Sequence, residues 1–331
     1  MMNLQRCSSI MYTRRIIYEK NFYCVLSTVF LPISLAGCKK EDHKQSTQIS
    51  SQVTMDEKYT EKDVTYQSGG IDVHATVTMP VTKEKVPYVL ICHGHGGTRS
   101  ENGGLDAIAQ GLTEKGIASI RMDYPGCGDS KEQFRNNTLT NMIQYTEDAM
   151  KYMNDHYAVN KDSIGIFGYS MGGRISLEML ASKKYNFKAV CLLAPAADTE
   201  DLKKLFGGAE NWELLKKTAQ ESKDGYTDFT TLYGQKQELS KKWFADLEEK
   251  DFATLMQEVK LSYNGPSMVI YAVDDTAVSP SVSKSVANEL GSEIIMTPED
   301  GHSYGFYSDK AYVKRIVVEN TVDFFEDKLA R

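Results

Sequence analysis

The stretch that decides the fold is IGIFGYSMGGRIS, from Ile164 to Ser176. Its apolar first residues predict a buried strand, and the residues from Met171 onward predict a helix. Between them, Ser170 stands in a Gly-x-Ser-x-Gly pattern, which is typical of a sharp strand-to-helix turn that lifts a serine hydroxyl above the edge of a sheet. Ser170 is therefore a candidate nucleophile, although the same pattern also arises by chance in glycine-rich loops.

Strand-like and helix-like segments alternate along most of the chain. Continuous apolar runs in residues 86–94, 187–197 and 267–275 predict fully buried strands. Amphipathic segments between and after them, such as residues 140–157 and 311–329, predict helices. This alternation predicts an α/β fold, in which helices cover both faces of a mostly parallel sheet.

One interval interrupts the alternation. Residues 199–265 contain no continuous apolar run of the buried-strand kind, and both tryptophans, Trp212 and Trp243, lie there. A long insertion between two core strands is typical of a lid or cap over a binding site. The sequence therefore predicts an inserted helical cap over residues 199–265.

Composition and charge favour a globular protein and argue against one that binds nucleic acid. Of the 331 residues, 41% are hydrophobic, which is enough for a large core. The formal net charge is −7, and no run of Lys and Arg is long enough to suggest a basic patch. After residue 38 only Cys92, Cys127 and Cys191 remain, and their odd number and wide spacing argue against a disulfide framework or a metal site.

The first 37 residues predict an export signal. Arg14, Arg15 and Lys20 precede the apolar run of residues 22–38, which is too short for a comfortable transmembrane helix. The run ends in Leu-Ala-Gly-Cys, which resembles a bacterial lipobox, the signal for attaching lipid to the cysteine. A plain secretory signal and a buried apolar segment are the alternatives.

We therefore expect residues 1–37 to be a lipoprotein signal peptide and Cys38 to be the lipidated first residue of the mature chain. Residues 38–62 are polar and lack apolar periodicity, which predicts a flexible tether. The folded domain is expected over residues 63–331, exported from the cytoplasm and held in the bacterial cell envelope by the lipid. The Lys-Lys-Glu-Asp that starts after the cysteine resembles surface-export signals of some Gram-negative lipoproteins.

A nucleophilic serine needs a base, and the sequence offers one in a suitable place. A serine hydroxyl is a poor nucleophile until a base takes its proton. In one known chain order of a serine triad, the acid and then the histidine follow the serine. Only His302 follows Ser170, in the loop sequence PEDGHSYGF. A predicted strand that lies between these two residues in the chain ends in Asp274 and Asp275. Either aspartate could orient the His302 imidazole.

The segment CHGHGG, residues 92–97, follows a predicted strand and is a candidate oxyanion hole. Acyl transfer places negative charge on the carbonyl oxygen, and two backbone N–H donors stabilise it. We assign these donors to the backbone of His95 and of Met171, the residue after the candidate nucleophile. The alternative is a metal or phosphate loop that uses His93 and His95, for which no adjacent carboxylate is available.

Motifs spread over most of the chain resemble the alpha/beta-hydrolase superfamily, and most closely the bacterial feruloyl and cinnamoyl esterases. The resemblance runs from about Val86 to the C-terminus and is carried by HGHGGTRSENGG, IASIRMDYPGCGDS, GYSMGG, LLAPAA, DDTAVSP and GHSYGF. It implies an alpha/beta-hydrolase fold. In the family pattern a valine stands three residues after the acid, and Val278 follows Asp275 at this distance, which favours Asp275 over Asp274.

The resemblance implies a serine carboxylesterase that hydrolyses small esters through an acyl-enzyme, with no cofactor and no metal. Hydroxycinnamoyl esters are candidate substrates. In that family the cap forms part of the pocket for the aromatic acid, and Tyr226 and Tyr233 are the candidate contacts here, with packing inside the cap as the alternative. The expected partners are the ester and the membrane that holds the lipid anchor.

Two other functions remain open. A serine peptidase of the acylaminoacyl-peptidase type, or an acyltransferase, would use the same nucleophile, base and acid. A non-catalytic envelope-binding lipoprotein would need none of them. Against this last possibility, the four predicted features of a serine hydrolase all occur in the expected order.

Overall fold

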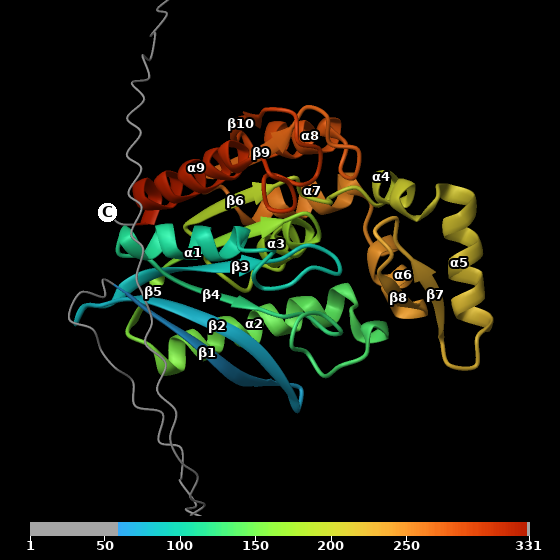
Figure 1. Ribbon diagram of the computed structural model, residues 1–331, viewed down its shortest axis with the longest axis horizontal. Helices are drawn as coiled ribbons and strands as arrows, with labels where there is room; N and C mark the ends of the chain where they lie inside the picture. Colours follow the sequence, from blue (N-terminus) through green and yellow to red (C-terminus); the bar gives the residue numbers. More distant parts are fainter. Residues whose placement is uncertain (1–58, 330–331) are drawn as a thin grey trace, which may run out of the picture. The chain divides into compact units, whose positions relative to one another are not determined.

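A computed structural model describes residues 59–329, and its central element is one mixed sheet (Figure 1). The strand order is β1-β2-β4-β3-β5-β6-β9-β10. β2 pairs antiparallel with β1 and with β4, whereas β4 and the strands after it in this order pair in parallel. The strands are β1 (Tyr59–Ser68), β2 (Ile71–Pro80), β3 (Val86–Cys92), β4 (Ala118–Met122), β5 (Val159–Tyr169), β6 (Ala189–Leu193), β9 (Ser267–Ala272) and β10 (Glu293–Thr297).

Helices cover both faces of the sheet, which confirms the predicted α/β fold. On one face α1 (Gly104–Glu114) and α9 (Ala311–Leu329) pack against each other and the strands. On the other face lie α2 (Leu139–His156), α3 (Met171–Ala181), α7 (Phe252–Ser262) and α8 (Pro280–Leu290). β4, β6 and β9 are buried along their whole length, as expected for parallel strands covered on both sides.

The parallel strands bring their carboxyl ends to the same edge of the sheet. β3 ends at Cys92, β5 at Tyr169 and β9 at Ala272, so the loops that follow them start close together. Ligands of α/β proteins bind at this edge. The three segments that the sequence analysis selected, around His95, Ser170 and Asp275, all begin here.

The insertion after β6 contains the predicted helical cap, together with one element that the sequence analysis did not predict. Besides helices it holds an antiparallel hairpin, whose alternating short strands lack the apolar run that predicts a buried strand. Trp212 and Trp243 are buried and pack together with Phe206 and Phe244. The elements of the cap lie to one side of the sheet in Figure 1. They are α4 (Thr199–Leu202), η2 (Lys203–Phe206), α5 (Ala209–Glu221), β7 (Tyr226–Thr230), β8 (Lys236–Ser240) and α6 (Lys241–Glu248).

The long helical segment after β8 is divided in two. Asp251 interrupts it, because its side chain accepts a hydrogen bond from the Thr254 N–H at 2.8 Å and so starts α7 as an N-cap. α7 packs against α3 and α8 in the helical layer of the sheet. The part of the insertion that stands apart from that layer is therefore residues 199–250, rather than the whole of residues 199–265.

The fold begins earlier than the predicted boundary at residue 63. β1 starts at Tyr59, inside the predicted tether of residues 38–62. The sequence of the first half of β1 resembles that of a flexible tether, because β1 is the edge strand of the sheet and most side chains in this half are exposed. Residues 1–58 lie outside the described part of the chain, so the signal peptide and the lipidation of Cys38 stay predictions. None of the helices between residues 59 and 329 is long and apolar enough to cross a membrane.

Candidate active site

Ser170 occupies the turn between β5 and α3, in a strained backbone conformation. Its φ of 55° and ψ of −115° are unusual for a residue with a side chain. The turn is tight because glycines stand on both sides: a Cβ on Gly172 would lie 2.1 Å from the Cys92 carbonyl oxygen, and one on Gly168 would lie 2.2 Å from the Gly172 carbonyl oxygen. Only glycine fits at either position, and the predicted strand–turn–helix is present.

His302 and Asp275 form a direct hydrogen bond. The distance between His302 Nδ1 and Asp275 Oδ2 is 2.7 Å, and Asp275 is only 3% exposed. Burial tends to raise the pKa of Asp275, but hydrogen bonds and the charge of His302 outweigh burial and hold this pKa below its ordinary value. An ionised carboxylate only accepts, so Nδ1 carries the hydrogen and Nε2 of His302 is left to take a proton.

The two neighbouring aspartates have separate partners. Asp275 Oδ1 also accepts the N–H groups of Ala277, at 2.9 Å, and Val278, at 3.0 Å. Asp274 instead accepts the N–H groups of Asp300 and Gly301, at 3.2 and 3.0 Å. The structure thus places Asp275, and not Asp274, against the His302 ring, while Asp274 fixes the loop that carries it.

Two tyrosines that the sequence analysis did not select hold His302 and its acid. The Tyr304 hydroxyl donates to Asp275 Oδ2 at 2.8 Å and accepts the Ala272 N–H at 3.0 Å. Tyr169, which directly precedes Ser170, donates from its hydroxyl to the His302 carbonyl and stacks its ring on the imidazole at 5.1 Å between centroids. Tyr169 thereby ties the loop of His302 to the turn of Ser170. A tyrosine carries no sequence signal for such contacts.

The loop after β3 lies directly against Ser170. A Cβ placed on Gly94 would be 3.4 Å from the Ser170 Cβ. The Gly94 carbonyl accepts hydrogen bonds from His93 Nδ1 at 2.7 Å and from the Gly97 N–H at 3.1 Å. In a trans peptide the C=O and the next N–H point in opposite directions, so these two bonds also fix the direction of the His95 N–H.

The two predicted oxyanion donors have no competing partner. Neither the His95 N–H nor the Met171 N–H donates a hydrogen bond to any residue between 59 and 329. Met171 N–H also lies at the N-terminus of α3, where the helix favours negative charge. Both groups are therefore available to a developing oxyanion.

The rings of His93 and His95 both form hydrogen bonds with protein groups, although His95 Nδ1 has no hydrogen-bond partner among the described residues. His93 Nε2 accepts the Tyr124 N–H at 3.1 Å, and its Nδ1 is bound to Gly94, so the ring is neutral. His95 Nε2 lies 3.0 Å from Gln237 Oε1 of the cap. Within the described residues, no group of three or more His, Cys, Asp or Glu side chains is placed to hold a metal ion.

The cap hairpin touches the oxyanion loop, but the two selected cap tyrosines lie elsewhere. Gln235 Nε2 donates to the Gly96 carbonyl at 2.9 Å, beside the contact between His95 and Gln237. Tyr226 stacks on the Arg135 guanidinium, 4.0 Å from the ring centroid. Tyr233 is 91% exposed in the hairpin turn. A substrate contact by either tyrosine stays a prediction.

The lowered pKa of the half-buried His95 ring predicts that stability depends on pH. Burial lowers its pKa from 6.5 to about 4, although the hydrogen bond with Gln237 acts in the opposite direction. Below pH 6.5 the His95 imidazole of the unfolded chain binds a proton, whereas that of the folded chain stays neutral until about pH 4. The free energy of unfolding therefore falls as the pH falls through this window. When the pH is lowered from 7 to 4.5, the free energy of unfolding of His95→Phe should rise by about 2 kcal/mol relative to that of the wild type, as measured by urea titration. Equal pH dependence of the two proteins would contradict this assignment.

Comparison with known proteins places the chain in a family. The family described as serine aminopeptidase, S33, matches residues 83–303. The quorum-quenching protein AidA of Acinetobacter baumannii is 31% identical over 114 residues, which are 34% of this chain and 36% of that protein. The mitochondrial acyl-coenzyme A thioesterase 2 of Rattus norvegicus is 27% identical over 233 residues, which are 70% of this chain and 48% of that protein. The chain thus aligns with at most about half the length of these relatives.

Solved structures share the fold at low sequence identity. Est1E of Butyrivibrio proteoclasticus, with ferulic acid bound, has a TM-score of 0.63 and 22% identity, over 81% of this chain and 100% of that chain. The esterase domain of a Rhodothermus marinus protein has a TM-score of 0.61 and 18% identity, over 82% and 99% of the two chains. The family match covers Ser170, Asp275 and His302, and the chain belongs to the serine aminopeptidase S33 family of alpha/beta hydrolases.

Proposed function

We propose that the chain is a serine carboxylesterase with Ser170 as nucleophile, His302 as base and Asp275 as the acid that orients it. The observation that carries the proposal is the 2.7 Å hydrogen bond between His302 and Asp275, formed on loops that Tyr169 ties to the strained turn of Ser170. Strain of this kind persists where the surrounding structure imposes it, and it occurs often at reactive residues.

We propose that these groups act in the following order. Ser170 Oγ attacks the ester carbonyl carbon while its proton passes to His302 Nε2. The N–H groups of His95 and Met171 bind the oxygen, which becomes negative. When the tetrahedral intermediate collapses, the alcohol leaves with the proton from His302, and Ser170 stays acylated. Water then attacks the acyl carbonyl carbon while one of its protons passes to His302 Nε2. When this second tetrahedral intermediate collapses, His302 returns the proton to Ser170 Oγ, and the carboxylic acid is released.

The substrates that we propose are small esters, with hydroxycinnamoyl esters as the first class to test. The support is the resemblance of the motifs around the site to those of feruloyl esterases, together with a cap whose hairpin reaches the oxyanion loop. A second candidate class is thioesters, because a relative aligned over 70% of this chain bears the name of an acyl-coenzyme A thioesterase. Peptide bonds, as in the family's description, and acyl transfer to other acceptors use the same acyl-enzyme.

The first test of this function compares ester hydrolysis by wild-type protein and Ser170→Ala. Methyl ferulate and short-chain p-nitrophenyl esters should be hydrolysed by the wild type, with kcat lowered by about 10⁴-fold or more in the variant, because the nucleophile is lost. Turnover of only the short esters would retain the triad and reject the hydroxycinnamoyl class. Full activity of Ser170→Ala would overturn the mechanism.

The neighbouring aspartates provide a matched control for the acid. Asp275→Asn should lower kcat strongly, because an amide cannot stabilise the imidazolium that forms at His302. Asp274→Asn keeps a carbonyl oxygen that can accept the Asp300 and Gly301 N–H groups, so its activity should stay close to wild type. Equal losses in the two variants would contradict the assigned roles.

We also propose that the protein acts outside the cytoplasm, anchored in the cell envelope by lipid on Cys38. The support is the sequence alone, through the basic residues, apolar run and Leu-Ala-Gly-Cys ending of residues 1–38. In bacteria fed radiolabelled palmitate, the wild-type protein should carry label and fractionate with membranes, whereas Cys38→Ser should be unlabelled. Cys24→Ser, within the signal, is the control that should behave as wild type. Label that persists in Cys38→Ser would refute the anchor.

A further inference from the structure

Glu101 is a buried acidic residue next to the active site that the proposed mechanism does not use. It is 1% exposed, and no Lys or Arg within residues 59–329 forms an ion pair with it. Its Oε1 accepts the Gly94 N–H at 2.9 Å, and its Oε2 accepts the Tyr307 hydroxyl. Glu101 thus joins the oxyanion loop, at Gly94, to the loop that carries His302, at Tyr307.

The backbone at Glu101 is strained to make these contacts. Glu101 and Asn102 have φ angles of 45° and 53°, in the left-handed region that residues with side chains rarely adopt. The carboxyl group also fills the space beside Gly97, where a Cβ would lie 2.0 Å from Oε1. Strain of this kind needs surrounding structure to maintain it.

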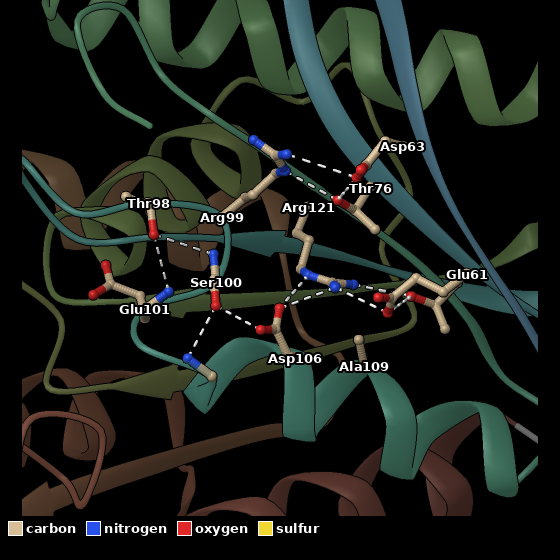
Figure 2. A network of polar contacts seen from close by, with 12 residues as sticks. Glu61, Asp63, Thr76, Thr98, Arg99, Ser100, Glu101, Asp106, Ala109 and Arg121 are labelled. Carbon is tan, nitrogen blue, oxygen red and sulfur yellow. Dashed lines mark hydrogen bonds and ion pairs between the residues drawn. The ribbon is translucent and has the colours of Figure 1, made fainter. Parts of the chain in front are cut away.

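A polar network on the outer side of the segment maintains this conformation (Figure 2). The Thr98 hydroxyl accepts the N–H groups of Ser100 and Glu101, and the Ser100 hydroxyl donates to Asp106 at 2.5 Å. Arg99 pairs with the buried carboxylate of Asp123. In Figure 2 the Glu101 carboxyl points away from this network. Its oxygens instead accept the Gly94 N–H and the Tyr307 hydroxyl, which belong to the oxyanion loop and the loop of His302.

A second link joins the same segment to the loop of His302. Asn102 Nδ2 donates to the Phe306 carbonyl at 2.6 Å. The Phe306 ring lies so close to Gly104 that a Cβ there would be 2.3 Å from it. Residues 98–104 therefore contact the oxyanion loop through Glu101 and the loop of His302 through both Glu101 and Asn102.

We infer that Glu101 is a positioning residue that holds the oxyanion loop and the His302 loop in register with each other. The inference rests on the proposed function. Gly94 and His95 share a peptide, so a displaced Gly94 also displaces the His95 N–H that is to bind the oxyanion. The Tyr307 contact acts on the loop that carries His302. One buried carboxyl group thereby sets the distance between two components that reach Ser170 from different strands.

The test combines kinetics with hydrogen–deuterium exchange of the full folded protein. Glu101→Ala should lower kcat about tenfold to a hundredfold and leave KM within about threefold, because the loss affects the transition state more than the bound ester. Amide exchange should become faster in both residues 92–97 and residues 302–308. Glu101→Gln should retain most of the activity, since its amide can accept the Gly94 N–H and donate to the Tyr307 hydroxyl.

Two further variants separate positioning from a general loss of stability. Tyr307→Phe removes one link only and should speed exchange in residues 302–308 but not in 92–97. Glu178→Ala removes another buried carboxyl group, paired with Arg174 and Lys250 at the far end of α3 from Ser170, and should change neither kcat nor exchange in these two segments.

Each outcome decides the inference. Unchanged kcat and exchange in Glu101→Ala, or a Glu101→Gln variant as impaired as Glu101→Ala, would overturn it. Losses of kcat in Glu178→Ala equal to those in Glu101→Ala would assign the effect to stability and also overturn it. Should the wild type hydrolyse none of the esters, the proposed function fails, and exchange in the two segments still shows whether Glu101 holds the loops.

Discussion

The close packing of the Ser170 turn against the end of β3 is the constraint on which the rest of the site depends. Gly172 fits against the Cys92 carbonyl with no room for a side chain, and Gly94 lies beside the Ser170 Cβ. β3 and β5 are neighbours in the sheet, so their carboxyl ends are held by strand pairing. This contact brings the candidate nucleophile and the candidate oxyanion loop together without any contribution from the cap.

The second constraint is that the Asp275 carboxylate and the His93 ring, both buried, have all of their polar side-chain atoms in hydrogen bonds. The Asp275 carboxylate accepts four hydrogen bonds, from His302, Tyr304 and two backbone N–H groups. The neutral His93 ring holds the Gly94 peptide. Such satisfied networks are rigid, because any movement leaves a buried group without a partner. The N–H groups proposed to bind the oxyanion and the imidazole of His302 can therefore hold their positions before a substrate binds.

Much of this arrangement could be predicted from sequence, because it depends on local pattern and chain order. The apolar runs that became β3, β6 and β9 predict buried strands, and the order of Ser170, Asp275 and His302 follows from their places at strand ends. The contacts of Glu101, Tyr169 and Tyr304 could not be predicted, because each depends on the three-dimensional approach of segments far apart in the chain. The hairpin β7–β8 was missed because its short strands alternate buried side chains with exposed or half-buried ones and so contain no continuous apolar run. The start of β1 was missed because its side chains are mostly exposed.

The most direct test of the central claim is the site of covalent modification by a fluorophosphonate, located by mass spectrometry of the intact protein and its peptides. The account predicts a single phosphonyl group on Ser170, formed much more slowly when His302 is replaced by alanine. Such a reagent reports the nucleophile without any assumption about the natural acyl group or alcohol. Modification of another residue, or none at Ser170, would contradict the claim that this strained turn carries an activated serine.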